Sequence, residues 1–127
     1  MKLLLDTHSF IFFVNGDDQL SEKAKAAILD SDILKFLSIA AVWEIAIKVS
    51  LNKLELTKSI SFLPELIESN GFILQEIEVA DAILVSTLPY LHKDPFDRMM
   101  VAQARNNSFT VVTKDLFFAP YGIQTIW

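Results

Sequence analysis

The sequence predicts an α/β fold in which a central, mainly parallel sheet is covered by helices on both sides. Short apolar segments alternate along the chain with segments of helical character, as in βαβ units. These apolar segments do not alternate with polar residues, which is typical of strands buried on both faces of a parallel sheet. With 127 residues, 52% of them hydrophobic, the chain can bury a sizeable core, and we expect one domain over residues 1–127.

The first predicted element is a short buried strand, Lys2–Leu5. A helix over Thr7–Asn15 follows, and the dipeptide Asn15-Gly16 is expected to end it. Ser21 is a residue type that caps helices, so a second helix is expected to run from there to about Asp30.

The apolar segment Leu34–Leu37 predicts the second strand, and Ser38 is placed to cap a helix from Ile39 to about Leu51. A further helix is expected over Ser61–Asn70, since Gly71 is suited to end it. The remaining elements are a strand over Phe72–Ile77, helices over Val79–Leu88 and Pro95–Asn106, and strands over Phe109–Val112 and Ile123–Trp127.

Composition excludes several classes of protein. The longest uncharged apolar stretches, such as Phe36–Trp43, fall far short of the roughly 20 residues that a membrane span needs. Asp6 interrupts the N-terminal leucines too early for a signal peptide. The absence of cysteine excludes a disulfide framework and a thiol nucleophile. We therefore expect a cytoplasmic protein without a membrane partner.

The net charge of −5 disfavours nucleic acid as a partner, because phosphate binding usually needs basic residues. This argument weakens if several of the acids bind divalent cations, since bound cations reverse the local field. Net charge therefore leaves nucleic acid binding open.

Four carboxylates lie beside apolar segments that would bring them to one place. Asp6 and Asp115 follow predicted strands, and ligands of parallel sheets bind beyond the carboxyl ends of the strands. Glu44 lies within an apolar helix and Asp97 near a helix start, and no matching set of four basic residues accompanies these acids. Charged groups beside core residues are costly unless they are paired or bind a metal. The sequence therefore predicts a site for one or two Mg²⁺ or Mn²⁺ ions.

Each acid also has a structural explanation. Asp6 can cap the helix that begins at Thr7, and this role is compatible with metal binding. Glu44 can form an ion pair with Lys48, one helical turn away. Asp115 can hydrogen-bond its own backbone in a turn.

Two acids compete in the segment Asp94-Pro95-Phe96-Asp97. Asp at the cap and Pro at the first helical position are a normal helix start, which accounts for Asp94 better than for Asp97. Asp97 is therefore the preferred ligand, with Asp94 a possible one. Arg98 and Lys48 are the cations expected to contact substrate phosphates.

Two threonines are expected to support the acids: Thr7, next to Asp6, and Thr113, which could orient a carboxylate or a metal-bound water. His8 and His92 lack ligand spacing, so packing or surface roles are expected for both. The segment Phe10–Val14 is apolar on more than one face, which suggests a partner or self-association surface.

Four motifs together span essentially the whole chain. They are Leu4-Leu5-Asp6-Thr7-His8, Trp43-Glu44-Ile45-Ala46-Ile47-Lys48, Asp94-Pro95-Phe96-Asp97-Arg98 with Ala102-Gln103-Ala104, and Thr113-Lys114-Asp115 followed by Phe117-Phe118. On these motifs the chain resembles the PIN-domain nucleases, and among them the VapC toxins of toxin–antitoxin modules.

The resemblance implies a PIN-like three-layer α/β/α sandwich and a Mg²⁺- or Mn²⁺-dependent endoribonuclease that hydrolyses phosphodiester bonds of tRNA, rRNA or mRNA. Carried over to this chain, the catalytic and metal-binding acids are Asp6, Glu44, Asp97 and Asp115. The resemblance also implies inhibition by a cognate VapB-like antitoxin and a homodimer.

Two other function classes stay open. Phosphoacceptor domains also use strand-end acids, Mg²⁺, a Thr and a Lys. The haloacid-dehalogenase-like phosphatases need a second acid where His8 stands, and response-regulator receivers need an acidic pair where Asp6 stands alone. A PIN module that binds RNA or protein with little activity is the other alternative. The complete set of acids counts against it, and metal-dependent turnover would distinguish the two.

Overall fold

Five short strands form one sheet in which every neighbouring pair runs parallel. The computed structural model describes residues 1–127. The strand order is β3-β2-β1-β4-β5. The strands are β1 (Lys2–Leu5), β2 (Leu34–Ser38), β3 (Ile73–Gln75), β4 (Thr110–Val112) and β5 (Thr125–Ile126). The predicted fold class, a parallel sheet within an α/β sandwich, is confirmed.

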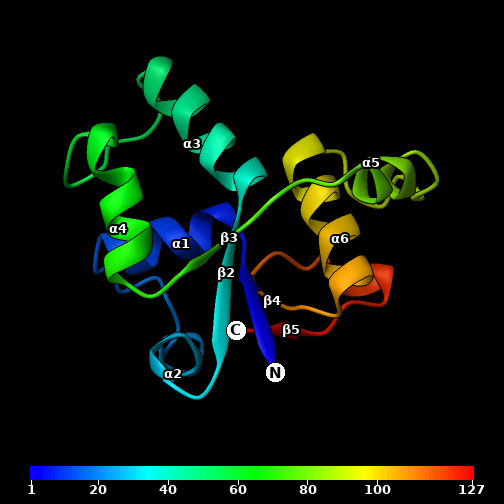
Figure 1. The fold of residues 1–127 in the computed structure, drawn as a ribbon, viewed down its shortest axis with the longest axis horizontal. Coiled ribbons are helices and arrows are strands. Elements are labelled where there is room, and N and C mark those ends of the chain that lie inside the picture. Colours follow the sequence, from blue (N-terminus) through cyan, green and yellow to red (C-terminus); the bar gives the residue numbers. More distant parts are fainter.

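The helices cover both faces of this sheet (Figure 1). From β1 to β3 the chain moves in one direction across the sheet, and from β3 to β5 it moves in the other. Right-handed crossovers then place the two sets of helices on opposite faces. One layer holds α1 (Thr7–Val14), α2 (Glu22–Leu29) and α4 (Leu63–Ser69), and the other holds α5 (Val79–Val85) and α6 (Pro95–Asn107).

Helix α3 (Ile39–Ser50) contacts helices of both layers, since it packs against α1 and α6. Two short 3₁₀ helices, η1 (Ile60–Phe62) and η2 (Ala119–Tyr121), complete the structure. None of the helices has the length and apolar content needed to cross a membrane.

The neighbouring strands β1 and β4 mark the point where the strand order switches. The chain leaves β1 toward one edge of the sheet and leaves β4 toward the other edge. Leu5 pairs in register with Val112 at the carboxyl ends of these strands, and the N–H of Asp6 donates to the carbonyl of Val112 at 3.1 Å. In open parallel sheets, ligands bind outside the carboxyl ends of the strands at this kind of switch point. The topology therefore brings the segments that follow β1 and β4 together where a ligand site is expected.

The core is centred on the two middle strands. Leu3, Leu4 and Leu5 of β1 and Val111 and Val112 of β4 are fully buried. The edge strand β3 differs, because Ile73 and Leu74 are exposed. Burial on both faces, predicted for all strands, therefore holds for the middle of the sheet and not for this edge.

The caps expected for three helices are present. The side chains of Ser21, Ser38 and Asp94 accept backbone N–H groups at the starts of α2, α3 and α6. Two helices differ from the expectation. The helix expected over Ser61–Asn70 is divided into η1 and α4, and α5 ends at Val85 rather than Leu88.

Candidate active site

Asp6 lies at the junction of β1 and α1, where both of its carboxylate oxygens have partners. Oδ1 accepts the N–H of Ser9 at 2.9 Å and so caps α1. Oδ2 accepts the hydroxyl of Thr113 at 2.5 Å. Since the residue is only 5% exposed, these bonds fix the orientation of a buried acid. The structure thus shows the cap that was the alternative explanation for Asp6, and it places the acid beside the segment that follows β4.

Glu44 extends from α3 toward α1 and is also 5% exposed. Its Oε1 accepts the hydroxyl of Thr7 at 2.6 Å, and its Oε2 lies 2.8 Å from Nζ of Lys48. The i,i+4 ion pair considered from the sequence therefore exists. It joins a buried carboxylate to a half-buried lysine, so it is not a pair on a solvent-exposed strip.

The start of α6 supplies two acids. Oδ1 of Asp94 accepts the N–H groups of Phe96 and Asp97 at 2.8 and 3.0 Å, which caps the helix. Oxygens of Glu44, Asp94 and Asp97 all lie within 4.8 Å of one another. Asp94 thus caps the helix and also lies among the acids.

Asp97 is the ionisable group whose pKa departs most from its ordinary value. Burial, as the largest cause, and the charges of Asp94, Asp6, Glu44 and Asp115 together raise its pKa from 3.8 to about 8. Burial disfavours the charged form, and each nearby negative charge disfavours it further. Three acids from separate elements therefore converge on Asp97, in addition to its neighbour Asp94.

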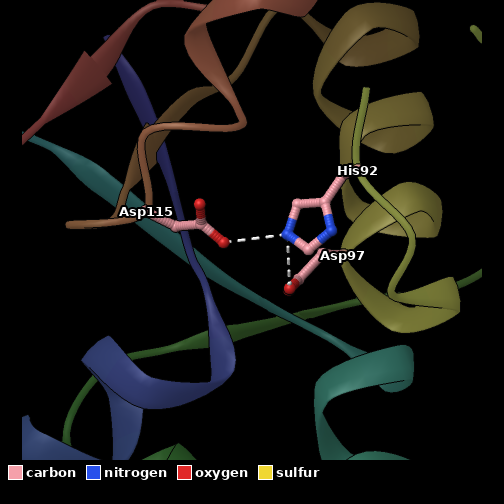
Figure 2. Close-up of side chains that lie close together, drawn as sticks. All are labelled: His92, Asp97 and Asp115. Atoms are coloured by element: carbon pink, nitrogen blue, oxygen red, sulfur yellow. Dashed lines mark hydrogen bonds and ion pairs between the residues drawn. The ribbon is translucent and has the colours of Figure 1, made fainter. Parts of the chain in front are cut away.

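Asp115 lies three residues beyond β4 in a turn that its own side chain stabilises. Its Oδ1 accepts the N–H of Phe117, and its N–H donates to the hydroxyl of Thr113, both at 2.9 Å. Its Oδ2 points the other way and lies 2.8 Å from Nε2 of His92. The same nitrogen lies 3.1 Å from Oδ2 of Asp97, so one imidazole joins the two acids (Figure 2).

The sequence predicted a packing or surface role for His92. Its ring does pack against Phe117 and Phe118, but it also contacts two of the acids, which the sequence did not predict. His92 lies at the centre of the acidic cluster, because the loop before α6 folds back onto the N-terminus of its own helix. The signal in the sequence is local: His92 stands two residues before the capping Asp94, whose N–H donates to its Nδ1 at 3.1 Å. Spacing rules for metal ligands do not detect this arrangement.

An open cleft of about 440 Å³ gives solvent access to three of the acids. Its walls combine negative, positive and apolar side chains: Asp6, His8, Asp97, Lys114, Asp115, Leu116 and Phe117. Lys114 is exposed there and was not singled out from the sequence as a phosphate contact.

Arg98 does not have the position that a phosphate contact requires. The residue is 4% exposed, and its guanidinium donates to the carbonyls of Val85, Leu88, Pro89 and His92 and to the hydroxyl of Tyr121. These bonds use carbonyls at and beyond the end of α5, where a helix favours a positive charge. The predicted role of Arg98 at a substrate phosphate is therefore corrected: it organises the loop that carries His92. Lys48 keeps a side chain that is 32% exposed next to Glu44.

The residues of the site fit a hard divalent cation. Carboxylate oxygens are the ligands that Mg²⁺ and Mn²⁺ prefer. Burial and the charges of the neighbouring acids raise the pKa of Asp97, and a cation among these acids would favour their charged forms. Asp6, Asp97 and Asp115 line the cleft, and Glu44 and Asp94 lie beside Asp97.

The family model described as "PIN domain" matches residues 3–122, nearly the whole chain. The chain belongs to the PIN-domain family. A comparison with curated protein sequences found no match.

Several solved structures share the fold. VapBC2 from Rickettsia felis, bound to a DNA fragment from its promoter, is similar with a TM-score of 0.73 and 12% identity, over 99% of this chain and 98% of that one. FitAcB from Neisseria gonorrhoeae is similar with a TM-score of 0.67 and 20% identity, over 98% and 96%. A toxin–antitoxin complex from Klebsiella pneumoniae gives 0.67 and 17%, also over 98% and 96%.

The crowding around Asp97 predicts a pH-dependent cost in stability. Because the folded-state pKa of Asp97 is about 8 and the ordinary value is 3.8, the folded protein binds more protons than the unfolded chain between these pH values. The stability of the metal-free protein should therefore fall as pH rises from about 4 to about 8. Asp97→Asn removes this penalty, and at pH 8 in chelator we expect it to raise Tm by at least roughly 3–5 °C, the shift that about 1 kcal/mol produces.

The control for this measurement is Asp18→Asn, which removes an exposed acid in the loop before α2. Thermal melts of the three proteins at pH 6 and pH 8 make the comparison. If Asp97→Asn and the wild type lose stability equally as pH rises, the cost does not lie at Asp97.

The buried network of Arg98 predicts intolerance of even a conservative change. A lysine at this position cannot reproduce the five hydrogen bonds, so buried carbonyls would be left without donors. We expect Arg98→Lys to lower the free energy of unfolding by about 2–4 kcal/mol, measured by urea denaturation. Arg105→Lys, at an exposed position on the same helix, is the control; a loss below about 0.5 kcal/mol for Arg98→Lys would contradict the structural role.

Proposed function

We propose that this protein is a Mg²⁺- or Mn²⁺-dependent endoribonuclease that acts as the toxin of a toxin–antitoxin module. The observation that carries this proposal is the convergence of Asp6, Glu44 and Asp115 on Asp97. Each of the three acids comes from a different part of the chain, and each raises the pKa of Asp97. The PIN-domain family, to which the chain belongs, gives this acidic cluster its chemical context.

Asp6, Asp97 and Asp115 would hold the cation, and Glu44 and Asp94 lie beside Asp97 as further candidate ligands. The cation supplies Lewis-acid activation of water and of the phosphodiester. The reaction is a hydrolysis: the oxygen of water forms a bond to phosphorus as the bond from phosphorus to the leaving sugar oxygen breaks, and a hydrogen of the water ends on that leaving oxygen. Thr113 and Thr7 each donate a hydroxyl hydrogen to an acid, to Asp6 and Glu44 respectively, and so fix the ligand oxygens. Asp97 holds a proton at its carboxyl group in the metal-free protein and gives it up when the cation binds.

The cleft has features that suit RNA. Lys114 is exposed in its wall and can contact a phosphate beside the scissile bond. Phe117 is 57% exposed on the same wall, and an aromatic face of this kind can stack on an unpaired base. Lys48, beside Glu44, is a second candidate for a phosphate contact.

A VapB-like antitoxin is the proposed inhibitor. The similar Klebsiella pneumoniae structure is a toxin–antitoxin complex, and the Rickettsia felis structure is of VapBC2. Leu116 and Phe117 expose apolar surface at the cleft, and Trp43 exposes more beside Glu44. A protein segment laid over these side chains would close access to the acids.

A homodimer is also part of the proposal, with a surface other than the face of α1 that the sequence suggested. Phe12, Phe13 and Val14 of α1, expected from the sequence to form a free apolar face, pack partly against the core. Val79 and Ile83, one turn apart on α5, are exposed and offer a different apolar surface.

The test is cleavage of a mixed RNA pool by purified, partner-free protein with Mg²⁺, Mn²⁺ or chelator. We expect cleavage that needs the metal and falls at least about 100-fold in Asp6→Asn, while Asp18→Asn cleaves like the wild type. Equal cleavage by Asp6→Asn would point to a contaminating nuclease. Metal binding without cleavage of any tRNA, rRNA or mRNA substrate would favour the binding-module alternative.

Lys114 gives a separate prediction. Because its charge would contact a phosphate rather than the cation, Lys114→Ala should raise KM for RNA several-fold and leave kcat within about twofold. The variant should also show a weaker dependence of KM on salt, as expected when one phosphate contact is lost. Lys23→Ala, at an exposed position on α2, is the control, and an unchanged KM in Lys114→Ala would remove the phosphate role.

A further inference from the structure

His92 is the one imidazole in direct contact with the acids, and it is well packed. Its side chain is 12% exposed, and the rings of Phe117 and Phe118 approach it edge-on at centroid distances of 5.8 and 5.9 Å. Its Nε2 lies between Oδ2 of Asp115 and Oδ2 of Asp97 (Figure 2). Asp97 lies in the first turn of α6 and Asp115 in the turn after β4, and His92 bridges them.

The hydrogen bonds assign the tautomer of His92. The N–H of Asp94 donates to Nδ1 at 3.1 Å, so Nδ1 is an acceptor and carries no hydrogen. The ring hydrogen is therefore on Nε2, where it is donated to Oδ2 of Asp115 at 2.8 Å, while Oδ2 of Asp97 lies 3.1 Å from the same nitrogen. Direct ligation of a metal by Nε2 would require the hydrogen on Nδ1, where it would point at the N–H of Asp94.

The position of His92 is set independently of the acids. Its N–H donates to the hydroxyl of Tyr121 at 2.8 Å, and its carbonyl accepts from Arg98 at 3.4 Å. Tyr121 in turn donates to the carbonyl of Pro89 at 2.7 Å, which anchors the same loop. A ring held in this way imposes its position on the carboxylates that it contacts.

We propose that His92 is a positioning residue of the acidic site: its Nε2–H, donated to Asp115, and its close contact with Asp97 hold the two acids in the mutual orientation in which they bind a divalent cation. The inference rests on the proposed function for the presence of that cation. Hydrogen bonds to the outer oxygens of ligating carboxylates orient them, and their loss weakens metal binding. The bond from Asp94 to Nδ1 also links the helix cap to the metal site.

The test measures binding of Mn²⁺, Mg²⁺ and Ni²⁺ by calorimetry, with the purified full chain and without RNA. His92→Phe keeps the ring between Phe117 and Phe118 and removes the donor. We expect it to weaken the binding of all three ions by a similar factor, about 10–100-fold. His92→Gln retains an N–H donor at the end of its side chain and should recover most of the affinity. Asp18→Asn, at an exposed position in the loop before α2, should bind like the wild type.

Two results would overturn the proposal. Wild-type affinity in His92→Phe would show that the bridge does not position the acids. A loss that is much larger for Ni²⁺ than for Mg²⁺ in both variants would identify the imidazole as a direct ligand, since imidazole favours Ni²⁺. Circular dichroism checks that the variants fold. If His92→Phe does not fold, the affinities of His92→Gln for the three ions still distinguish these outcomes. RNA cleavage by the wild type is measured in parallel, so metal binding without cleavage would count against the nuclease and not against the role of His92.

Discussion

The repulsion among acids at the carboxyl end of the sheet is the constraint on which the site depends. Asp97 is surrounded by Asp94, Asp6, Glu44 and Asp115, and its pKa rises to about 8 as a result of burial and these charges. The structure opposes the repulsion by placing a hydrogen-bond donor against each of three acids: Thr113 against Asp6, Thr7 against Glu44, and His92 against Asp115. Such an arrangement reduces the stability of the metal-free protein, and a bound cation would offset that cost.

The relative positions of the acids depend on the topology of the sheet and on the buried guanidinium of Arg98. Adjacent parallel strands β1 and β4 fix Asp6 relative to the segment that carries Asp115. Arg98 and Tyr121 fix the loop that leads into α6, and through it the positions of His92 and Asp94. Arg98, which the sequence suggested as a contact for substrate phosphate, therefore stabilises the loop that carries His92.

Much of the fold could be predicted because it follows from local signals, such as apolar strand segments and the caps Ser21, Ser38 and Asp94. The acids could be singled out because each adjoins an apolar element. Arg98 was misjudged because adjacent helical residues point about 100° apart, so Asp97 can face the acids while Arg98 faces the end of α5. The role of His92 depends on how a non-periodic loop folds back, and no local pattern specifies that.

If these acids converge to bind a divalent cation, calorimetric titration with Mn²⁺ in buffers of different ionisation enthalpy should detect both the ion and the proton that it displaces. Since Asp97 holds a proton near neutral pH, binding at pH 7 should release roughly one proton per ion. In Asp97→Asn the affinity should fall and the proton release should disappear. No binding by the wild type, or the same affinity and proton release in Asp97→Asn, would contradict the account.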